Sequence, residues 1–401
     1  MKATRRDWLK QCALSSAFFT ASAAKPLPAH VVSKNEQTSI GGSAAKYGRM
    51  LNQLRDLITA RTRVTTLRGS RRRFNHYWLR DQVHVMKALK YWEQDLSSML
   101  EFFLEQQTPS GMYWDHAMPL NHTHSRTQIF DPKYWMVCEE EGRLYMRLPV
   151  EADCEYLAVE GAYLVWQITG DDAWMMKWLP TLERGLRYCM NDPLRWSKKY
   201  QLVKRGYTID TWDFQQTPPD MEAWGGGRQK VIFDIDENTP MGIMHGDNSG
   251  MFAACGQLAE MYQAAGVPRK AEQWKKEAAG FRARTNETCW NGKYYAHFVE
   301  DDPLPDYVKM DPQKSITLSN SYSINRGLPN HEMAASIIRQ YKKMEDEHQG
   351  QSFAEWYCMY PPVKPHWAGY EPGNYMNGGI TTIVAGELAK AAFQHGYEQY
   401  G

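Results

Sequence analysis

Two short segments of the sequence set carboxylic acids between aromatic side chains. Residues 208–214 read Thr-Ile-Asp-Thr-Trp-Asp-Phe and contain Asp210 and Asp213, while residues 353–357 read Phe-Ala-Glu-Trp-Tyr and contain Glu355. Hydrolysis of a glycosidic bond needs two carboxyl groups, one to protonate the leaving oxygen and one to activate water. Aromatic rings add flat apolar surfaces on which a sugar can pack. The two segments together favour a sugar-hydrolysing site.

The general acid is to be chosen between Asp210 and Asp213, which lie three residues apart. In an extended segment the two side chains face opposite sides, whereas in a turn they converge. Partial burial against Trp212 and Phe214 would raise the pKa of a carboxyl group and suit it to donate a proton. Aspartates that cap a turn are the structural alternative, so both candidates stay open at this point.

The general base is to be chosen between Glu355 and Glu371. A solvated loop glutamate is rarely set among rings, and Glu355 stands among them, shortly before the Pro361-Pro362 break. As a base it would deprotonate a water molecule on the far face of the sugar ring. Glu371 has the same aromatic setting in residues 369–375 and is the rival, since it can also bind sugar hydroxyls.

Further candidate sugar contacts lie near predicted helix starts. Arg80 and Asp81 follow Trp78, where they can form a rigid pair that holds two neighbouring hydroxyls, unless Asp81 caps the helix instead. His245 and Asp247 begin another predicted helix, and a structural position suits His245 equally well. The remaining candidate substrate contacts are Trp212, Trp356, Tyr357, Tyr370 and Asn377, the last in an Asn-Gly-Gly run that allows close backbone approach.

The search for metal and cofactor motifs gives little. Residues 234–238 gather oxygen ligands but fall short of the EF-hand pattern, so we expect a solvated loop there and keep calcium as the alternative. A phosphate-binding glycine loop, a serine nucleophile elbow and a His-Glu-x-x-His zinc motif are all absent from the sequence. The seven cysteines lack the close spacing of a metal site, and we expect buried free thiols. Apart from the calcium alternative, we expect no cofactor.

Helical periodicity dominates the rest of the chain. The predicted helical pairs cover 151–169 with 172–190, 247–265 with 268–288, and 321–328 with 330–344, and further helices are predicted over 46–67, 81–106 and 377–399. The loops between them, at 107–150, 191–246, 289–320 and 347–376, are rich in aromatic residues, proline and glycine, with room for short β-hairpins. Loops of this length usually carry function. The layout predicts an all-α toroid of helical hairpins with a loop-built site at one end.

Composition narrows the class of partner. The net charge is +1, from 47 basic and 46 acidic residues, which gives no electrostatic reason to expect nucleic acid or an anionic membrane. The 15 tryptophans and 23 tyrosines exceed what a core requires, and this excess favours a carbohydrate site. We therefore expect an oligosaccharide or glycan as substrate; the composition says nothing about oligomeric state.

The N-terminus resembles a twin-arginine export signal. Arg5 and Arg6 precede an apolar run over residues 13–24, whose small residues at 21–24 suit cleavage. We predict a signal peptide over residues 1–30, a single catalytic domain over 31–401, and a periplasmic or secreted protein. Later apolar runs are too short to span a bilayer.

The order of these segments resembles the six-hairpin glycosidases over most of residues 75–395. Named members are the glucosidase domain of glycogen-debranching enzymes, glucoamylases and the processing α-glucosidase I group. Arg80-Asp81 resembles their substrate-binding Arg-Asp pair, and residues 353–357 are similar to the Phe-x-Glu-Tyr-Tyr segment that holds the base. Residues 211–213 resemble the Thr-Trp-x-Asp segment of the acid, although here the aspartate directly follows the tryptophan.

This resemblance implies an (α/α)6 barrel and hydrolysis with inversion, with Asp213 as acid and Glu355 as base. The expected activity is exo-hydrolysis of a terminal sugar from an α-linked oligosaccharide or glycan. One alternative is an unsaturated-uronyl hydrolase, lyase or epimerase on the same barrel; a lyase or epimerase would use His245 or His366 as proton shuttles. A non-catalytic glycan-binding protein is the other. Metal-independent α-mannosidases share the Trp-Leu-Arg-Asp style of residues 78–81.

Overall fold

The computed structural model describes residues 37–67, 70–74, 77–120, 130–218, 232–348 and 356–401. The chain divides into two compact units, residues 1–54 and 55–401, and helix α2 (Gln37–Thr59) crosses the boundary between them. Every other helix or strand of the described residues belongs to the second unit. The predicted signal peptide of residues 1–30 lies outside the described residues, so the predicted domain boundary stays a prediction.

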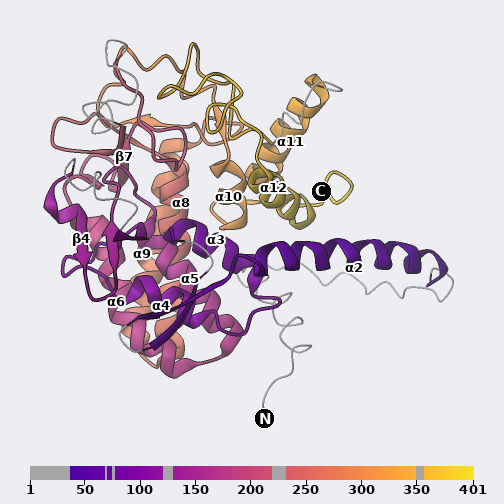
Figure 1. Ribbon diagram of the computed structural model, residues 1–401. Helices are drawn as coiled ribbons and strands as arrows, with labels where there is room; N and C mark the ends of the chain where they lie inside the picture. The colour runs from indigo at the N-terminus through magenta and orange to yellow at the C-terminus, as the bar shows by residue number, and fades with distance from the viewer. Residues whose placement is uncertain (1–36, 68–69, 75–76, 121–129, 219–231, 349–355) are drawn as a thin grey trace. The chain divides into compact units, whose positions relative to one another are not determined.

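The second unit is built on a ring of inner helices. These are α3 (Leu79–Leu89), α5 (Cys154–Thr169), α8 (His245–Ala264), α10 (Ser319–Asn325) and α12 (Thr382–Gln394), each packed against the next. An ion pair of 3.5 Å between Lys87 of α3 and Glu387 of α12 closes the series. In Figure 1, α10 and α12 lie side by side next to α8. The arrangement is that of the predicted α/α toroid.

Outer helices pack against this ring. They are α4 (Ser97–Leu104), α6 (Asp172–Asn191), α9 (Pro268–Cys289) and α11 (His331–Glu347). The outer helix α9 buries Ala271, Trp274, Ala278 and Phe281, a stripe with the helical period, and exposes most of its other positions. The inner helix α5, by contrast, buries every residue of its first turns.

Short antiparallel strands occupy the loops. β3 (His116–Pro119), β4 (Trp135–Cys138) and β5 (Arg143–Met146) form a sheet of order β3-β5-β4, with the 3-10 helix η3 (Pro132–Tyr134) before β4. β6 (Trp196–Ser197), β7 (Leu202–Gly206), β8 (Met241–Ile243) and β9 (Val299–Glu300) follow one another in a second sheet. β1 (Arg63–Leu67) pairs with β2 (Ser70–Phe74), and β10 (Ile316–Thr317) with β11 (Met359–Tyr360). Residues 291–294 connect the bridged residues Trp290 and Tyr295.

Two of the predicted helices are wrong in extent at the start of the chain. The helix expected over 46–67 ends at Thr59, because the β-branched run from Val64 favours the strand β1. The helix expected over 81–106 is broken between α3 and α4. There Asp95 accepts hydrogen bonds from the Ser98 N–H at 3.1 Å and the Ser98 hydroxyl at 2.6 Å, which starts a new helix.

The last helix also begins later than predicted. Position 377 was its expected start, but α12 begins at Thr382, with the Thr381 side chain accepting from the Ile383 N–H. Gly378 has a φ of 81°, which lies outside helical backbone. A side chain at Gly379 would place its Cβ 2.2 Å from the Tyr375 carbonyl oxygen, so the close backbone approach expected for this run is present.

The inner helices begin at one end of the ring. Asp153, the residue before α5, pairs with Arg80 in the first turn of α3. At the start of α8, a Cβ on Gly246 would lie 2.3 Å from Ser319 Oγ at the start of α10, so glycine is needed there. Free N–H groups and the positive ends of the helix dipoles therefore gather at this end. In Figure 1, the segment around β7 lies beyond the same end of α8.

Candidate functional site

One guanidinium organises the carboxylates at this end of the ring. Arg80 Nε lies 2.5 Å from Asp153 Oδ2, its Nη1 lies 2.8 Å from Asp213 Oδ1, and its Nη2 lies 3.3 Å from Glu151 Oε1. The Arg80 network, as we call these residues, joins α3, the segment before α5 and the loop after β7. Of the predicted residues, Arg80 and Asp213 are thus brought into direct contact across 133 positions of sequence.

Asp213 keeps access to solvent and is surrounded by rings. Its side chain is 13% exposed, whereas those of Glu151 and Asp153 are 1% and 2% exposed. The Trp212 ring meets the Tyr375 ring edge-on at 4.7 Å, and Phe214 contacts Tyr370 at 5.5 Å. A sugar that reaches Asp213 would therefore meet aromatic faces from two separate loops.

Glu151 is the buried carboxyl beside Asp213. Burial raises its pKa well above the ordinary value, Arg80 opposes this rise, and the charge of Asp213 and a hydrogen bond with it add to the rise. Burial and the charge of Asp213 thus favour the neutral form of Glu151, and Arg80 works against it. Asp153 differs: burial opposes its ionisation too, but the close Arg80 contact prevails and lowers its pKa.

Glu151, Asp153 and Cys154 lie close enough together to share a cation. Arg80 already supplies positive charge to both carboxyl groups, so we assign no metal to this cluster. At the predicted calcium alternative, Asp236 accepts hydrogen bonds from the Asn238 N–H at 2.9 Å and from Thr239 Oγ1 at 3.2 Å. Those bonds close a turn, as a solvated loop would.

Asp210 points away from the Arg80 network. It is fully buried, its φ is +49°, and its Oδ2 accepts from the Ser319 N–H at 2.9 Å. Burial works against ionisation, but the His245 ring and the hydroxyls of Ser319 and Thr317 lower its pKa. A buried carboxylate that accepts protein hydrogen bonds and lies in the left-handed region suits a turn better than proton donation. The geometry favours Asp210 as a structural residue that fixes the turn from which Asp213 reaches Arg80.

His245 and Asp247, at the start of α8, are both fully buried. The Nδ1 of His245 lies 3.0 Å from the Ala296 carbonyl oxygen, and burial lowers its pKa to about 4, against the charge of Asp210. Asp247 faces Arg205 at 3.4 Å, and burial raises its pKa against that pairing. This geometry favours structural positions for these two predicted sugar contacts.

The predicted contacts at the start of α3 are more accessible. Trp78 is half-buried and stacks on His116 at 4.1 Å, and Asp81 is exposed in the first turn of the helix. Trp78, whose side chain makes no capping bond, precedes the helix, so Asp81 is not its N-cap. Asp81 lies close enough to Tyr375 for its charge to act on the phenol. These residues border the Arg80 network.

The C-terminal loop supplies the remaining candidates. Tyr370 is half-buried and Glu371 is exposed, while Asn377 is fully buried. Asn377 Oδ1 accepts from the Val363 N–H at 2.7 Å and its Nδ2 donates to the Tyr370 carbonyl at 2.9 Å, so it shapes the loop that carries Tyr370. Glu355, the predicted base, lies outside the described residues. Its neighbours Trp356 and Tyr357 are half-buried, and Tyr357 stacks on Tyr360 at 5.7 Å.

Sequence reasoning missed Glu151, Asp153 and Tyr375. The first two were placed at the start of a predicted helix and read as ordinary helix residues. Their signal is a pair of acids in the otherwise apolar run 148–154, just before an inner helix. Buried acids at such a position need a cation, and Arg80 is the cation that the fold brings there.

A second charge cluster lies about two helical turns deeper in the ring. Lys87 Nζ lies 2.8 Å from Glu160 Oε1 and 3.5 Å from Glu387 Oε1, and Arg326 Nη2 lies 3.7 Å from Glu160 Oε2. The Lys87 network, as we call these four residues, joins α3, α5, α10 and α12. It matches two cations with two carboxylates.

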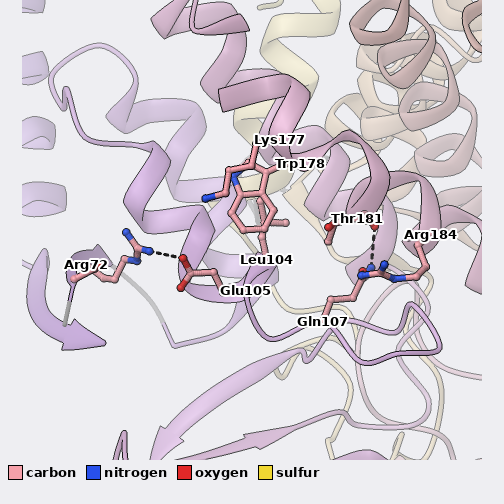
Figure 2. A pocket seen from close by; sticks show the side chains of 9 residues that line it. Arg72, Leu104, Glu105, Gln107, Lys177, Trp178, Thr181 and Arg184 are labelled. Atoms are coloured by element: carbon pink, nitrogen blue, oxygen red, sulfur yellow. Dashed lines mark hydrogen bonds and ion pairs between the residues drawn. The ribbon is translucent and has the colours of Figure 1, made fainter. Parts of the chain in front are cut away.

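A cavity of about 470 Å³ lies apart from this end of the ring, between β2, α4 and α6. Figure 2 shows Arg72 paired with Glu105, and Gln107 bridging Arg184 and Thr181. Since these side chains pair with one another and the cavity holds no residue of the Arg80 network, we assign it no part in the site.

Comparison with solved structures identifies the barrel. Two structures of the GH63 mannosylglycerate hydrolase from Thermus thermophilus, one with Tris and one with Tris and D-glycerate, each share 14% identity with this chain at a TM-score of 0.56. The matches cover 81% of this chain and 82% and 83% of theirs. An uncharacterized conserved protein from the same organism gives a TM-score of 0.51 at 14% identity, over 80% of both chains.

Neither a family model nor a curated protein matches the sequence. The structural likeness confirms the predicted α/α toroid, a fold that this chain shares with the GH63 hydrolase, and does not single out the glucosidase group. Within the described residues, every helix is either too short or too polar to cross a bilayer. The cysteines from Cys138 to Cys358 are all free thiols, buried except for Cys138, as predicted.

Proposed function

We propose that this protein is an exo-acting glycoside hydrolase that releases a terminal sugar from an α-linked oligosaccharide or glycan. The observation that carries the proposal is the Asp213 carboxyl group. It is partly exposed, held at 2.8 Å by Arg80 and ringed by aromatic side chains at the end of a ring where helix N-termini meet. The fold, shared with a mannosylglycerate hydrolase, supports the same reaction class.

In the proposed mechanism Asp213 protonates the leaving glycosidic oxygen while Glu355 removes a proton from the attacking water. Water then enters from the face opposite the leaving group, which inverts the anomeric carbon. Arg80 fixes the Asp213 carboxyl group, and Trp212, Tyr370 and Tyr375 hold the sugar ring. Glu371 is the alternative base, because it is exposed on the same loop as Tyr370.

The geometry disfavours the lyase and epimerase alternative. His245, one of its two proton shuttles, is fully buried and occupied by the Ala296 carbonyl. His366 is half-buried, and its Nδ1 accepts from the Gly369 N–H at 3.3 Å. A side chain that closes its own turn is poorly placed to shuttle protons to a substrate.

The test is sugar release by the purified protein. The panel comprises α-linked gluco-, manno- and rhamno-oligosaccharides, uronic-acid glycans and mannosylglycerate, with Asp213→Asn, Glu355→Gln and Glu371→Gln in parallel. Proton NMR of the first product formed gives its anomeric configuration. The proposal is supported if the wild type releases a sugar and Asp213→Asn does not. The base is then the glutamate, Glu355 or Glu371, whose glutamine variant is inactive. Release that Asp213→Asn leaves intact would refute the acid assignment.

We further propose export through the twin-arginine route, from Arg5 and Arg6, with residues 1–30 removed. Replacing both arginines by lysine keeps the charge, so it tests the motif itself. Cell fractionation should then find the wild type in the periplasm or medium and the variant in the cytoplasm. Equal export of both would exclude this route.

A further inference from the structure

The Arg80 network carries more acid than one cation can balance. Its guanidinium faces the carboxyl groups of Asp153, Asp213 and Glu151, at 2.5, 2.8 and 3.3 Å. Three carboxylates around a single positive charge in a largely buried setting are unfavourable, because each further negative charge has lost its water. The network is therefore expected to retain a proton.

Two further cations, Arg205 and Arg147, act on Asp153 without removing this imbalance, and Arg205 already faces Asp247 at 3.4 Å. Arg147 donates to the Glu151 backbone carbonyl at 2.7 Å and to the Glu155 carboxylate at 3.0 Å, so its own charge is already matched. On the β3 side, Asp115 adds negative charge near Glu151, and its Oδ2 accepts from the Leu148 N–H at 2.6 Å. The surroundings thus favour a neutral group.

Glu151 is the member that holds this proton best. Its Oε1 is buried and, among the described residues, receives no hydrogen bond from any N–H or O–H group. Its Oε2 lies 3.5 Å from the Cys154 thiol, a weak donor. Asp153 and Asp213 each have a closer charged contact with Arg80. A proton on Oε1 would turn an unsatisfied acceptor into a donor towards Asp213.

We propose that Glu151 is a positioning residue that stores the proton for Asp213. This inference rests on the proposed function. Arg80 holds the Asp213 carboxyl group in an ion pair at 2.8 Å, yet a general acid must carry a proton at the moment of bond cleavage. A neutral Glu151 that donates its hydrogen bond to Asp213 resolves this conflict.

The proton balance is as follows. Glu151 passes its proton to an Asp213 oxygen and becomes a carboxylate, while Asp213 becomes neutral. Asp213 then gives that proton to the glycosidic oxygen as the bond between the anomeric carbon and this oxygen breaks. The base holds the proton taken from water, and after product release one proton returns through solvent to the Glu151–Asp213 pair.

The first test needs no substrate. The infrared spectrum of the full-length folded protein at pH 7 should show a protonated-carboxyl C=O band that Glu151→Gln removes. Glu160→Gln is the matched control, because Glu160 is a second glutamate on the same segment that is ionised beside Lys87. It should leave the band unchanged. Thermal unfolding checks that both variants are folded, and Glu151→Asp, which keeps a carboxyl group, should retain a band.

The second test is the pH profile of sugar release. Glu151→Gln keeps a hydrogen-bond donor next to Asp213 but has no proton to give. We expect kcat/KM at neutral pH to fall about 10- to 100-fold, with the alkaline limb moved to lower pH and the loss shrinking towards acid pH. Glu160→Gln should leave the shape of the profile unchanged.

The outcomes separate the two proposals. A band lost in Glu151→Gln together with a shifted limb supports the inference. Sugar release without such a band, or with an unshifted limb in Glu151→Gln, overturns the role of Glu151 and leaves the hydrolase proposal standing. A band with no release of any sugar by the wild type overturns the proposed function, and the role of Glu151 in it as well.

Discussion

Glu151 lies just before α5 and Glu160 lies within it, and the fold gives their carboxyl groups opposite charge environments. Burial raises the pKa of Glu151, since Arg80 is shared with two nearer carboxyl groups. Burial acts on Glu160 as well, but Lys87 and Arg326 both face it and lower its pKa to about 2. Glu160, which faces two cations, is therefore a structural residue. Glu151 shares its one cation with two other carboxyl groups, and this leaves it able to take part in proton transfer.

The same contrast separates the two networks. The Lys87 network joins four inner helices with equal numbers of cations and carboxylates, and Asn325 donates to the Glu387 backbone carbonyl at 2.8 Å. The Arg80 network is unbalanced, and the most exposed of its carboxyl groups is that of Asp213. We therefore expect substitutions in the Arg80 network to change activity, and substitutions in the Lys87 network to change stability.

The largest expected effect tests the unbalanced side. Asp213→Asn should lower kcat/KM about 10²- to 10⁴-fold, because a general acid contributes about that much. Its melting temperature should change little, since the side chain lies at the exposed edge of the network. Steady-state sugar release and calorimetry measure both. A large loss of stability with activity retained would contradict the assignment of the Arg80 network to activity.

The next largest effect tests the balanced side. Lys87→Met leaves Glu160 and Glu387 without their shared cation and should cost about 3–5 kcal/mol of unfolding free energy, measured in urea. The double variant Lys87→Met/Glu160→Gln should recover part of this loss. The folded fraction of Lys87→Met should release sugar with the same pH optimum as the wild type. A shifted optimum would show that the Lys87 network affects catalysis.

The two glutamates should give opposite pH dependences of stability. Glu160 has a folded pKa of about 2 against an ordinary value of 4.5, so between these values the unfolded chain binds more protons. Its stabilisation is present above about pH 4.5 and is lost as the pH falls towards 2, on the order of 3 kcal/mol. Glu160→Gln should remove that acid-side decline in urea unfolding.

For Glu151 the sign is reversed. Its folded pKa lies above the ordinary value, so above about pH 4.5 the folded chain binds more protons than the unfolded chain. Stability should fall as the pH rises through this window, and Glu151→Gln should flatten the fall. Equal slopes for wild type and variant above about pH 4.5 would contradict an unbalanced network.

The smallest expected effect concerns the rings around Asp213. Tyr375 is 46% exposed and contacts Trp212 edge-on, so Tyr375→Ala should leave stability almost unchanged. We expect KM to rise about threefold to tenfold, from the loss of about 1 kcal/mol of sugar packing, with kcat nearly constant. Tyr91→Ala, another exposed tyrosine at 46%, is the matched control and should change neither constant.

Some of this architecture was readable from local pattern. The outer helix α9 shows a stripe of Ala271, Trp274 and Phe281, and its predicted and observed starts coincide at Pro268. The break between α3 and α4 was missed, because the capping role of Asp95 depends on where Ser98 folds. Arg80 and Asp213 were both predicted as site residues, but nothing local showed that they touch.

The amino-acid sequence by itself determined the helical hairpins, the aromatic loops and the placement of Asp213 among rings, because periodicity and neighbouring side chains are local properties. Only the tertiary structure decided the charge states. Whether Glu151 keeps a proton and Glu160 loses one depends on which cations the ring of helices brings within about 4 Å, since Coulomb energy and desolvation depend on distances between residues far apart in sequence. The chemistry of the site is thus a property of the assembled ring.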